Sequence, residues 1–408
     1  MHECVIVGGG VHGTYLIQRL LEDTDIERES VALVDPNERL LASFRRKARA
    51  CDMDALRSTF VHHVGTEPFG LESFAEARDR EDELISRPSY PRCPSLSLFL
   101  DYAEYVIDGT DLASLHRRAA VESISRPDDG GEGFVLECRD PDGSTTSIRT
   151  RACVLAIGHG GRYRTPAWAA DLDAVTHVWD DAFDPDAAAT ETIVVGGGIT
   201  AAQLAICLAD RESVTLLSRH ELETATVEAD PRWINWNHIE RHLHRHPPGS
   251  RARSDVLRQA RNDATIPPAL FERLQTAAVD DDLTIRRGEG RSARTVDGRS
   301  RLLLEDGGCL SADRIVLATG FEPVFEHPFV EQLSATLELE RGHRGMPVLD
   351  DETLAWQHST GDTTSIYVSG ALAAGTVGPL AGNIAGARRS ADRITQALAA
   401  DRSPVPAE

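Results

Sequence analysis

The stretch CVIVGGGVHGTYLI, Cys4–Ile17, decides the fold at the start of this chain. It reads as a buried strand that ends in Gly8-x-Gly10-x-x-Gly13, followed by an amphipathic helix. The next apolar run, SVALVD, ends at Asp35, 22 residues after Gly13. Glycines at this spacing allow a tight turn and let a pyrophosphate approach the N–H groups at the helix N-terminus, while the terminal acid accepts hydrogen bonds from a ribose. The stretch therefore predicts a dinucleotide-binding site.

The same device occurs again about 190 residues later, in IVVGGGITAAQLA, Ile193–Ala205. Here the pattern is Gly196-x-Gly198-x-x-Ala201. Alanine is accepted in the third place because that position only has to be small for the helix to pack on the strand. The chain is therefore expected to bind a second dinucleotide.

The strand after the second helix, SVTLLSRH, ends in Ser218 and Arg219 and not in an acid. A carboxylate would repel a 2′-phosphate, whereas an arginine can hold it through charge-assisted hydrogen bonds. We therefore expect the second site to take NADPH in preference to NADH, and the first site, with Asp35, to hold FAD. A solvated surface arginine is the alternative, which leaves NADH open. A flavin in one site and a hydride donor in the other would explain why the device occurs twice.

Later apolar strands, in RACVLAIGHGG and ADRIVLATGF, indicate how the two sites are arranged along the chain. We expect an α/β fold with two Rossmann-like dinucleotide-binding domains, in which the NADPH domain is inserted into the FAD domain. The FAD domain is expected to span residues 1–165 and to resume at 315–408. The NADPH domain is then 166–314, with a helical insertion at about 225–275.

The composition narrows the environment and the partners. The 408 residues carry 65 acidic and 43 basic side chains, a formal charge of −22, and Lys47 is the sole lysine. Such an acidic, lysine-poor surface is typical of proteins from salt-accumulating organisms and disfavours nucleic acids and anionic membranes as partners. No run of about 18–20 apolar residues and no targeting signal is present, so a soluble cytoplasmic protein is expected.

The seven cysteines carry no paired spacing, since no C-x-x-C occurs. Neither a disulfide framework nor a zinc ribbon is therefore expected. His238 and His242 lie four residues apart on an expected helix, but arginines crowd the same stretch, so a solvated helix is favoured and no metal is expected.

The chain resembles the flavoprotein oxidoreductases with two dinucleotide-binding domains. Among these it resembles most the flavin-dependent lysine and ornithine N-hydroxylase group of monooxygenases. The general marks are the two glycine patterns and LATGF, residues 317–321. More particular marks are MDALRSTFVHH at 53–63, YPRCPSLSLFLDYAEYV at 90–106 and GPLAGNIAGARRSADRI at 378–394. The resemblance implies FAD and NADPH as cofactors, with a small molecule and molecular oxygen as reactants.

The resemblance also implies which segments contact the cofactors. The positions expected on these grounds are Met53, Leu56, Arg57, Ser58, Thr319, Gly320, Gly370, Gly378, Pro379 and Asn383. His62 and His63 follow the first of these segments, and one of them could act catalytically as a proton donor or orienting group. A structural or solvated histidine pair is the alternative.

Two other functions stay open at the level of sequence. The first is an NAD(P)H-dependent flavoprotein reductase that passes electrons to a small acceptor, although the missing C-x-x-C argues against a thiol-based electron relay. The second is a flavin-binding protein that responds to redox state as a binding partner. An N-hydroxylating monooxygenase is the leading hypothesis.

Overall fold

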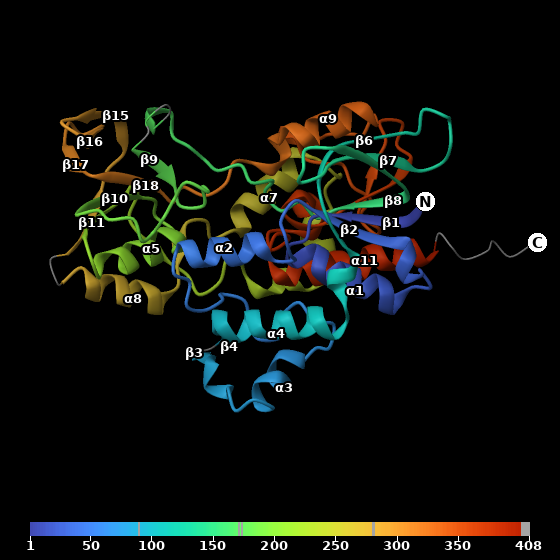
Figure 1. The fold of residues 1–408 in the computed structure, drawn as a ribbon, viewed down its shortest axis with the longest axis horizontal. Helices are drawn as coiled ribbons and strands as arrows, with labels where there is room; N and C mark the ends of the chain where they lie inside the picture. The colour runs from blue at the N-terminus through green and yellow to red at the C-terminus, as the bar shows by residue number, and fades with distance from the viewer. Residues whose placement is uncertain (89, 170–171, 173, 280–281, 401–408) are drawn as a thin grey trace, which may run out of the picture.

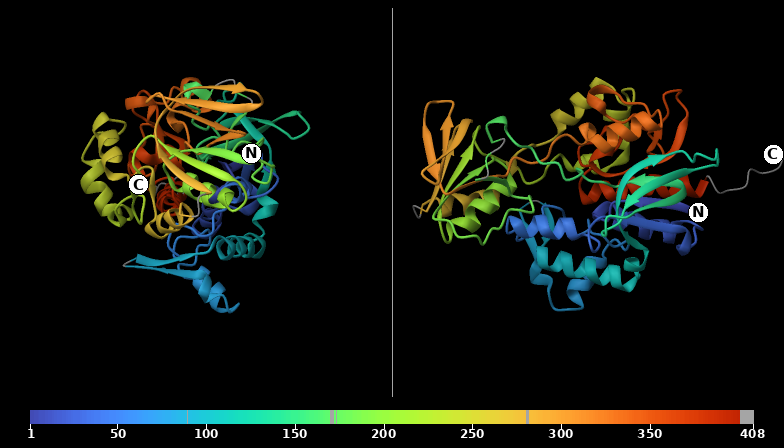
Figure 2. Two further views of the ribbon diagram at one scale, coloured as in Figure 1. Left: turned by 90° about the vertical axis from the view of Figure 1, so that its left-hand side faces the viewer. Right: turned by 45° about the horizontal axis from the view of Figure 1, so that its top comes forward.

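The computed structural model describes residues 1–88, 90–169, 172, 174–279 and 282–400. Two sheets, each with helices packed on it, lie toward opposite ends of an elongated molecule (Figures 1 and 2). No helix in the described ranges is long and apolar enough to cross a lipid bilayer.

The first sheet contains the N-terminal glycine pattern. Its five central strands are parallel, and the edge strand β19 runs antiparallel to β20. The order is β19 (Ala355–Gln357), β20 (Thr363–Val368), β8 (Thr145–Leu155), β1 (His2–Val7), β2 (Val31–Asp35) and β5 (His116–Arg118). The same sheet also contains β7 (Phe134–Arg139) and β6 (Ala120–Ser125): β7 pairs antiparallel with the long strand β8, and β6 pairs antiparallel with β7.

Helices α1 (Val11–Asp23) and α11 (Ile384–Ala400) lie side by side and contact each other (Figure 1). They come from opposite ends of the chain, so the C-terminal segment completes the unit that the N-terminal strand begins. The segment between β2 and β5 adds α2 (Ala42–Ala50), α3 (Gly70–Glu76), β3 (Leu84–Arg87), β4 (Tyr90–Pro94) and α4 (Leu96–Gly109). In Figure 1, α3, β3, β4 and α4 lie below α1 and α11, and α2 lies to their left.

The second sheet contains the second glycine pattern, and all of its strand pairs are parallel. The order is β14 (Leu283–Arg287), β11 (Ser213–Ser218), β10 (Glu191–Val195), β18 (Arg314–Leu317) and β9 (Val175–His177). Helices α5 (Ile199–Ala209) and α8 (Pro268–Ala277) pack against each other on this unit. A separate antiparallel sheet is formed by β15 (Gly290–Val296), β16 (Arg299–Leu304) and β17 (Cys309–Ala312).

The predicted α/β class with two Rossmann-like units is confirmed, but two expected boundaries need correction. The limit at residue 315 falls inside β18, which pairs with β10 and β9 of the second sheet. A strand that ends in a small-residue turn looks the same in either sheet, so its sequence did not show its neighbours. The helical insertion expected to reach residue 275 also takes in α8, which covers α5 of the second unit. Residues 401–408, at the expected end of the FAD domain, lie outside the described residues.

The segment 231–260 is inserted in the sequence of the second unit, yet it packs on the first. It contains a 3-10 turn (Pro231–Ile234), α6 (Trp236–Ile239), a π-turn (Glu240–His244) and α7 (Arg251–Ala260). Arg253 is fully buried and donates two hydrogen bonds of 2.6 Å to the carboxylate of Asp351. The Trp233 side chain forms a buried apolar cluster with Leu243 and Leu380. We call this segment the cover.

Two connections that join the units run side by side in opposite directions at one point. Tyr163 in the first connection and Phe321 in the second form a β-bridge. Lys47, on α2, places its ammonium 4.9 Å from the centre of the Phe321 ring, 5.7 Å from that of Tyr163 and 5.8 Å from that of Trp179. We call these four residues the lysine cage. Burial lowers the pKa of Lys47 to about 8, and no carboxylate in the described ranges forms an ion pair with it.

Candidate functional site

The first glycine turn is built so that one of its three glycines faces open space. Gly8 has φ +115°, and a Cβ there would lie 2.4 Å from the Ala156 carbonyl oxygen. A Cβ on Gly13 would lie 1.9 Å from the Gly8 oxygen. A Cβ on Gly10 would meet nothing within 4 Å, although this residue begins α1. The turn therefore packs through Gly8 and Gly13 and leaves room at Gly10.

That open space lies at the first N–H groups of α1, which no side chain caps. Helix N-terminal N–H groups without partners favour an anionic pyrophosphate. Asp35 stands beside the turn, where its Oδ2 accepts from the Gly9 N–H at 2.7 Å and its Oδ1 from the Asn37 N–H at 2.8 Å. The residues present thus fit the pyrophosphate and ribose of a dinucleotide.

The second turn has the same construction. A Cβ on Gly196 would lie 2.5 Å from the Ala318 carbonyl oxygen, and the Ala201 methyl group fills the small space beside it. Gly198 begins α5, again without a side-chain cap, and a Cβ there would make only an ordinary contact, 3.6 Å from the Ala264 Cα. The second turn therefore also presents N–H groups to an anion.

The end of β11 carries the residues expected to read the nucleotide. Ser218 is buried and its hydroxyl donates to the His220 carbonyl at 2.8 Å. Arg219 is exposed, and its guanidinium forms no ion pair within the described ranges. Arg287 ends the neighbouring strand β14 directly opposite Ser218, and it pairs at 3.4 Å with Glu221. An unpaired arginine at this place is available to a phosphate.

The segment expected to contact the flavin is divided between three surroundings. Leu56 is 4% exposed in the core of the first unit, so its side chain is not available to a cofactor. Met53 packs against the core of the second unit. Arg57 and Ser58 line a small cavity. Leu56 is therefore corrected to a core residue, because the apolar character that fitted a flavin contact also fits burial.

Arg57 ties the two units together. Its side chain donates to the Thr226 carbonyl at 3.0 Å, to the Ala225 carbonyl and to the Thr265 hydroxyl at 3.1 Å. All three partners belong to the second unit. Arg57 therefore holds the rim of the small cavity in place, in addition to facing it.

The C-terminal segment returns to the same region. Gly370 and Gly378 have φ of +84° and +94°, which favours glycine, and a Cβ on Gly378 would lie 3.4 Å from the Trp233 ring of the cover. The Pro379 carbonyl accepts from Arg261 at 2.9 Å. Asn383, just before α11, lines the small cavity.

Thr319 and Gly320 follow β18 and lie in the second connection between the units. The Gly320 carbonyl accepts from the Arg164 N–H at 2.9 Å, and the Thr319 hydroxyl donates to the Arg164 carbonyl. The LATGF stretch thus joins the two connections to each other. Its contact with a cofactor remains a prediction.

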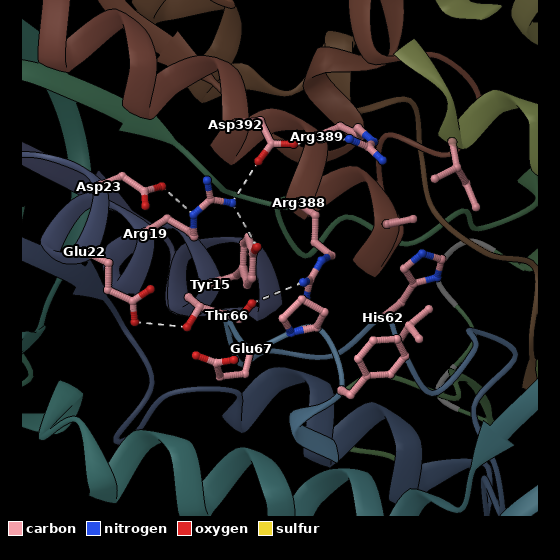
Figure 3. A pocket seen from close by; sticks show the side chains of 15 residues that line it. Tyr15, Arg19, Glu22, Asp23, His62, Thr66, Glu67, Arg388, Arg389 and Asp392 are labelled. Atoms are coloured by element: carbon pink, nitrogen blue, oxygen red, sulfur yellow. Dashed lines mark hydrogen bonds and ion pairs between the residues drawn. The ribbon is translucent and has the colours of Figure 1, made fainter. Parts of the chain in front are cut away.

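Two cavities meet at His62. The smaller, which we call the inner cavity, is lined by Arg57, Ser58, His62, Tyr90, Glu228 and Asn383, among others. The larger, which we call the outer cavity, has a volume of about 600 Å³ and lies between α1, α11 and residues 61–69 (Figure 3). His62, Ile234 and Ala385 line both. The inner cavity thus brings together segments from the first unit, the C-terminal segment and the cover.

The two adjacent histidines have different surroundings. The His62 Nδ1 and the Thr59 hydroxyl form a hydrogen bond of 3.1 Å. Burial, together with the positive charges of Arg388 and Arg389, lowers the pKa of His62 to about 4. His63 is 0% exposed, and its Nδ1 accepts from the Gly65 N–H at 3.2 Å. The expectation of a catalytic His63 is corrected, because a ring enclosed by backbone and core cannot reach a substrate.

Sequence reasoning missed the polar residues of the outer cavity. Ala385, Arg388, Arg389 and Asp392 repeat at i, i+3, i+4 and i+7 and thus share one face of α11. That spacing was visible in the sequence. What was not visible is that this face borders a cavity and not solvent.

The fold and site define a class, the oxidoreductases that bind two dinucleotides in two Rossmann-like units. The model of the pyridine nucleotide-disulphide oxidoreductase family matches residues 117–401, and the chain belongs to this family. A model described as FAD-NAD(P)-binding matches residues 5–160. The expectation of a flavoprotein oxidoreductase that uses FAD and a pyridine nucleotide is confirmed.

Solved structures resemble the whole chain at low sequence identity. The ornithine N-hydroxylase of Kutzneria sp. 744 has a TM-score of 0.81 and 18% identity, over 99% of this chain and 100% of that one. The ornithine hydroxylase of Pseudomonas aeruginosa has a TM-score of 0.78 and 19% identity, over 98% of this chain and 100% of that one. The bacillithiol disulfide reductase of Bacillus cereus has a TM-score of 0.63 and 16% identity, over 98% of this chain and 99% of that one. No curated protein sequence matches the chain. These likenesses concern the fold.

Proposed function

We propose that the chain is an FAD-dependent, NADPH-oxidising monooxygenase that hydroxylates the nitrogen of a small amine with molecular oxygen. Its whole-length likeness to two ornithine hydroxylases supports this reading. NADPH is favoured over NADH by the exposed, unpaired Arg219 at the end of β11.

The observation that carries the proposal is the composition of the inner cavity. A family of disulphide oxidoreductases would lead one to expect a cysteine there, yet no described residue lining either cavity is a cysteine. Cys93 approaches the region, but it is buried and its thiol donates to the Arg57 carbonyl at 3.6 Å. Without a thiol to take electrons from a reduced flavin, oxygen is the acceptor that the site favours.

The flavin would supply both the acceptance of hydride and the activation of oxygen, which no side chain can perform. The first glycine turn would hold the FAD: Gly10 and the N-terminus of α1 would receive its pyrophosphate, and Asp35 would accept hydrogen bonds from its ribose. The second turn would hold NADPH, and Arg219 would bind its 2′-phosphate. Pro231 and Ile234 of the cover, together with Leu380, line the inner cavity, and these apolar side chains would help to exclude water from the reacting atoms.

His62 lines the inner cavity and could accept a hydrogen bond from an amine there. With a pKa of about 4 it is neutral near pH 7. A neutral ring accepts a hydrogen bond from the amine, whereas a charged ring would repel an ammonium group. The hydrogen bond to Thr59 fixes the ring's orientation.

The proposal is tested by purifying the protein with its flavin and supplying NADPH, oxygen and a panel of small amines. The expected result is that one class of amine accelerates NADPH consumption and yields a hydroxylamine, with little hydrogen peroxide. Peroxide equal to the oxygen consumed with every amine would contradict it. NADPH-driven reduction of a disulfide without oxygen would favour a reductase, to which the likeness to a bacillithiol disulfide reductase points.

We place this activity in the cytoplasm. All seven cysteines are free thiols, and five of them are buried. Unpaired cysteines are the rule in a reducing compartment.

A further inference from the structure

Two paired segments carry the chain from the second unit into the cover and back again. Residues 223–229 lead out, residues 261–266 return, and the two pair as short parallel strands. We call these two segments the ribbon. Ile266 is buried in the core of the second unit, whereas Ala229 belongs to the apolar cluster of the cover. Val227, between these ends, lines the inner cavity. The ribbon therefore spans the junction of the two units beside that cavity.

The returning half of the ribbon touches the second glycine turn at Ala264. A Cβ on Gly198 would lie 3.6 Å from the Ala264 Cα, so Ala264 stands beside the start of α5. Ala264 has φ +55°, a left-handed conformation that is strained for a residue with a side chain. Its N–H forms no hydrogen bond with any residue that the structure describes. Such strain persists only where the surroundings hold it, so other contacts must keep Ala264 beside the turn.

The Thr265 hydroxyl supplies one of these contacts. It donates to the Asn262 carbonyl at 2.9 Å and thereby closes the turn that contains Ala264. Asn262 is held in its turn, because its N–H donates to the Glu228 carbonyl at 2.8 Å and its side chain to the Val227 carbonyl at 3.0 Å. The turn at Ala264 is thus joined to the half of the ribbon that lines the inner cavity.

Arg57 of the first unit holds both halves of the ribbon from outside. Its Nη2 donates to the Thr265 hydroxyl at 3.1 Å, so this hydroxyl accepts from the guanidinium and its own proton is directed elsewhere. Its Nε donates to the Thr226 carbonyl at 3.0 Å on the opposite half. The Leu56 N–H donates to the Pro94 carbonyl at 3.0 Å, which anchors the backbone before Arg57 within the first unit. The guanidinium is therefore a fixed point against which the ribbon rests.

We propose that Arg57 is a positioning residue for the pyridine nucleotide. By orienting the Thr265 hydroxyl it holds Ala264 against the second glycine turn, as one wall of the place for the nucleotide's pyrophosphate. A side chain of the first unit thus completes the nucleotide site of the second unit. This inference rests on the proposed placement of NADPH at the second turn. It does not depend on which acceptor reoxidises the flavin.

The proposal gives Arg57 and Arg219 different effects on the two nucleotides. Arg219 would bind the 2′-phosphate, which NADP⁺ carries and NAD⁺ lacks. The pyrophosphate is common to both. Loss of Arg57 should therefore weaken NADP⁺ and NAD⁺ alike, whereas loss of Arg219 should weaken NADP⁺ alone.

The test measures the binding of NADP⁺ and of NAD⁺ to the FAD-loaded protein by isothermal titration calorimetry, which requires no turnover. Arg57→Met keeps an unbranched side chain but removes the hydrogen bonds. It should weaken both nucleotides at least fivefold, the lower end of the coupling commonly found between two sites, while the purified variant keeps stoichiometric flavin. A smaller loss for either nucleotide would overturn the proposal. Loss of the flavin would do so too, since it would assign Arg57 to the other cofactor.

A second variant tests the hydroxyl itself. Thr265→Val keeps the shape of the side chain and removes both hydrogen bonds of the hydroxyl, so it should also weaken the two nucleotides. Adding Arg57→Met to it should cause little further loss, because both changes act through the same group. Two fully additive losses would contradict this route. Thr224→Val, exposed on the other half of the ribbon, is the control and should change neither nucleotide.

Failure of this inference can be told apart from failure of the proposed function. If Arg219→Ala weakens NADP⁺ and Arg57→Met does not, the nucleotide lies at the second turn and the role of Arg57 is overturned. If neither variant weakens NADP⁺, the placement of the nucleotide is overturned as well. The panel of amines tests the monooxygenase activity independently of both results.

Discussion

Gly10 and Gly13 show how two glycines of one pattern can have different roles. Gly13 has to be glycine for the fold, because its Cβ would collide with the Gly8 carbonyl oxygen. Gly10 has free space around it and is constrained only by what the turn binds. The two roles can be separated by substitution.

Gly10→Val should give a folded protein that does not retain FAD. The added side chain has room in the structure but would occupy the place of the pyrophosphate. The flavin content of the purified protein, read from its absorbance, checks this, with circular dichroism to confirm folding. Gly109→Val is the matched control, since a Cβ there also meets nothing within 4 Å but lies at the end of α4. A folded Gly10→Val protein with stoichiometric flavin would show that the flavin pyrophosphate does not lie at Gly10.

Arg219→Ala should weaken NADPH binding by about 1.5 to 3 kcal/mol, the scale of a hydrogen bond to a charged group. NADH, which lacks the 2′-phosphate, should be nearly unaffected. Dissociation constants of the two nucleotides are the measurement. Arg211→Ala, which breaks an exposed pair with Asp186 just before β11, serves as the control. A similar loss for both nucleotides would show that Arg219 does not read the phosphate.

Among single residues, the sequence predicted the glycine turns and their acid correctly but could not always separate a site residue from a core residue. The glycines and Asp35 fall where their pattern requires, since the pattern itself encodes local geometry. Leu56 and His63 were predicted to lie in the site but are buried, because apolar and histidine side chains occur both in binding sites and in protein cores. Only the three-dimensional surroundings separate the two.

Among the elements, the cover shows most clearly how tertiary contacts decide position. Its sequence is rich in arginine and histidine, which is typical of a solvated helix. The buried Arg253, which pairs with Asp351, and the buried Trp233 fix the cover on the first unit instead. A buried charge pair joining residues almost 100 positions apart leaves no periodic signal in the sequence, so this docking could not be predicted.

Asp351→Asn should loosen the cover. The change leaves the fully buried Arg253 without its counter-charge, which costs about 3 to 5 kcal/mol for a buried pair. Amide hydrogen exchange over residues 231–260 should therefore speed up. Asp255→Asn, which breaks an exposed pair with Arg258 on α7 itself, is the control and should leave the exchange unchanged. Unaltered protection in Asp351→Asn would show that apolar contacts alone hold the cover.

For the whole molecule, the two glycine patterns predicted two parallel sheets, because each pattern specifies a strand, a turn and a helix. The boundary at β18 was wrong because strand pairing is a long-range property. The cavities could not be predicted either, since each is bounded by segments far apart in the chain.

The molecule should lose stability as the pH falls from about 6.5 to about 4. Burial, chiefly, lowers the pKa of His12, His62, His63, His159 and His177 to about 4. The unfolded chain takes up these protons near pH 6.5 and the folded one only near pH 4, so protons favour unfolding within that window. Above pH 6.5 the stability from these groups is complete.

Denaturant unfolding in 1 M NaCl checks this, because salt screens the repulsion among the many carboxylates. We expect the free energy of unfolding to fall by at least about 3 kcal/mol across the window, the equivalent of a two-unit shift in one buried histidine. The loss should be smaller in His62→Gln and unchanged in His246→Gln, a control on the cover. Constant stability from pH 6.5 to 4 would mean that these rings are protonated in the folded state.

The lysine cage lies where the two units meet, so the reactivity of Lys47 can be used to follow their separation. Since Lys47 is the sole lysine, an amine-reactive ester has only this side chain and the N-terminal amine to modify. Burial lowers the pKa of Lys47 to about 8, so much of this amine is unprotonated and nucleophilic in mildly alkaline buffer, while the three aromatic rings beside it restrict access to it. Its acylation rate, followed by peptide mass spectrometry with the N-terminus as internal standard, should therefore rise or fall as nucleotide binding separates or tightens the two units. A rate that matches the N-terminal amine under all conditions would mean that the rings offer no shelter.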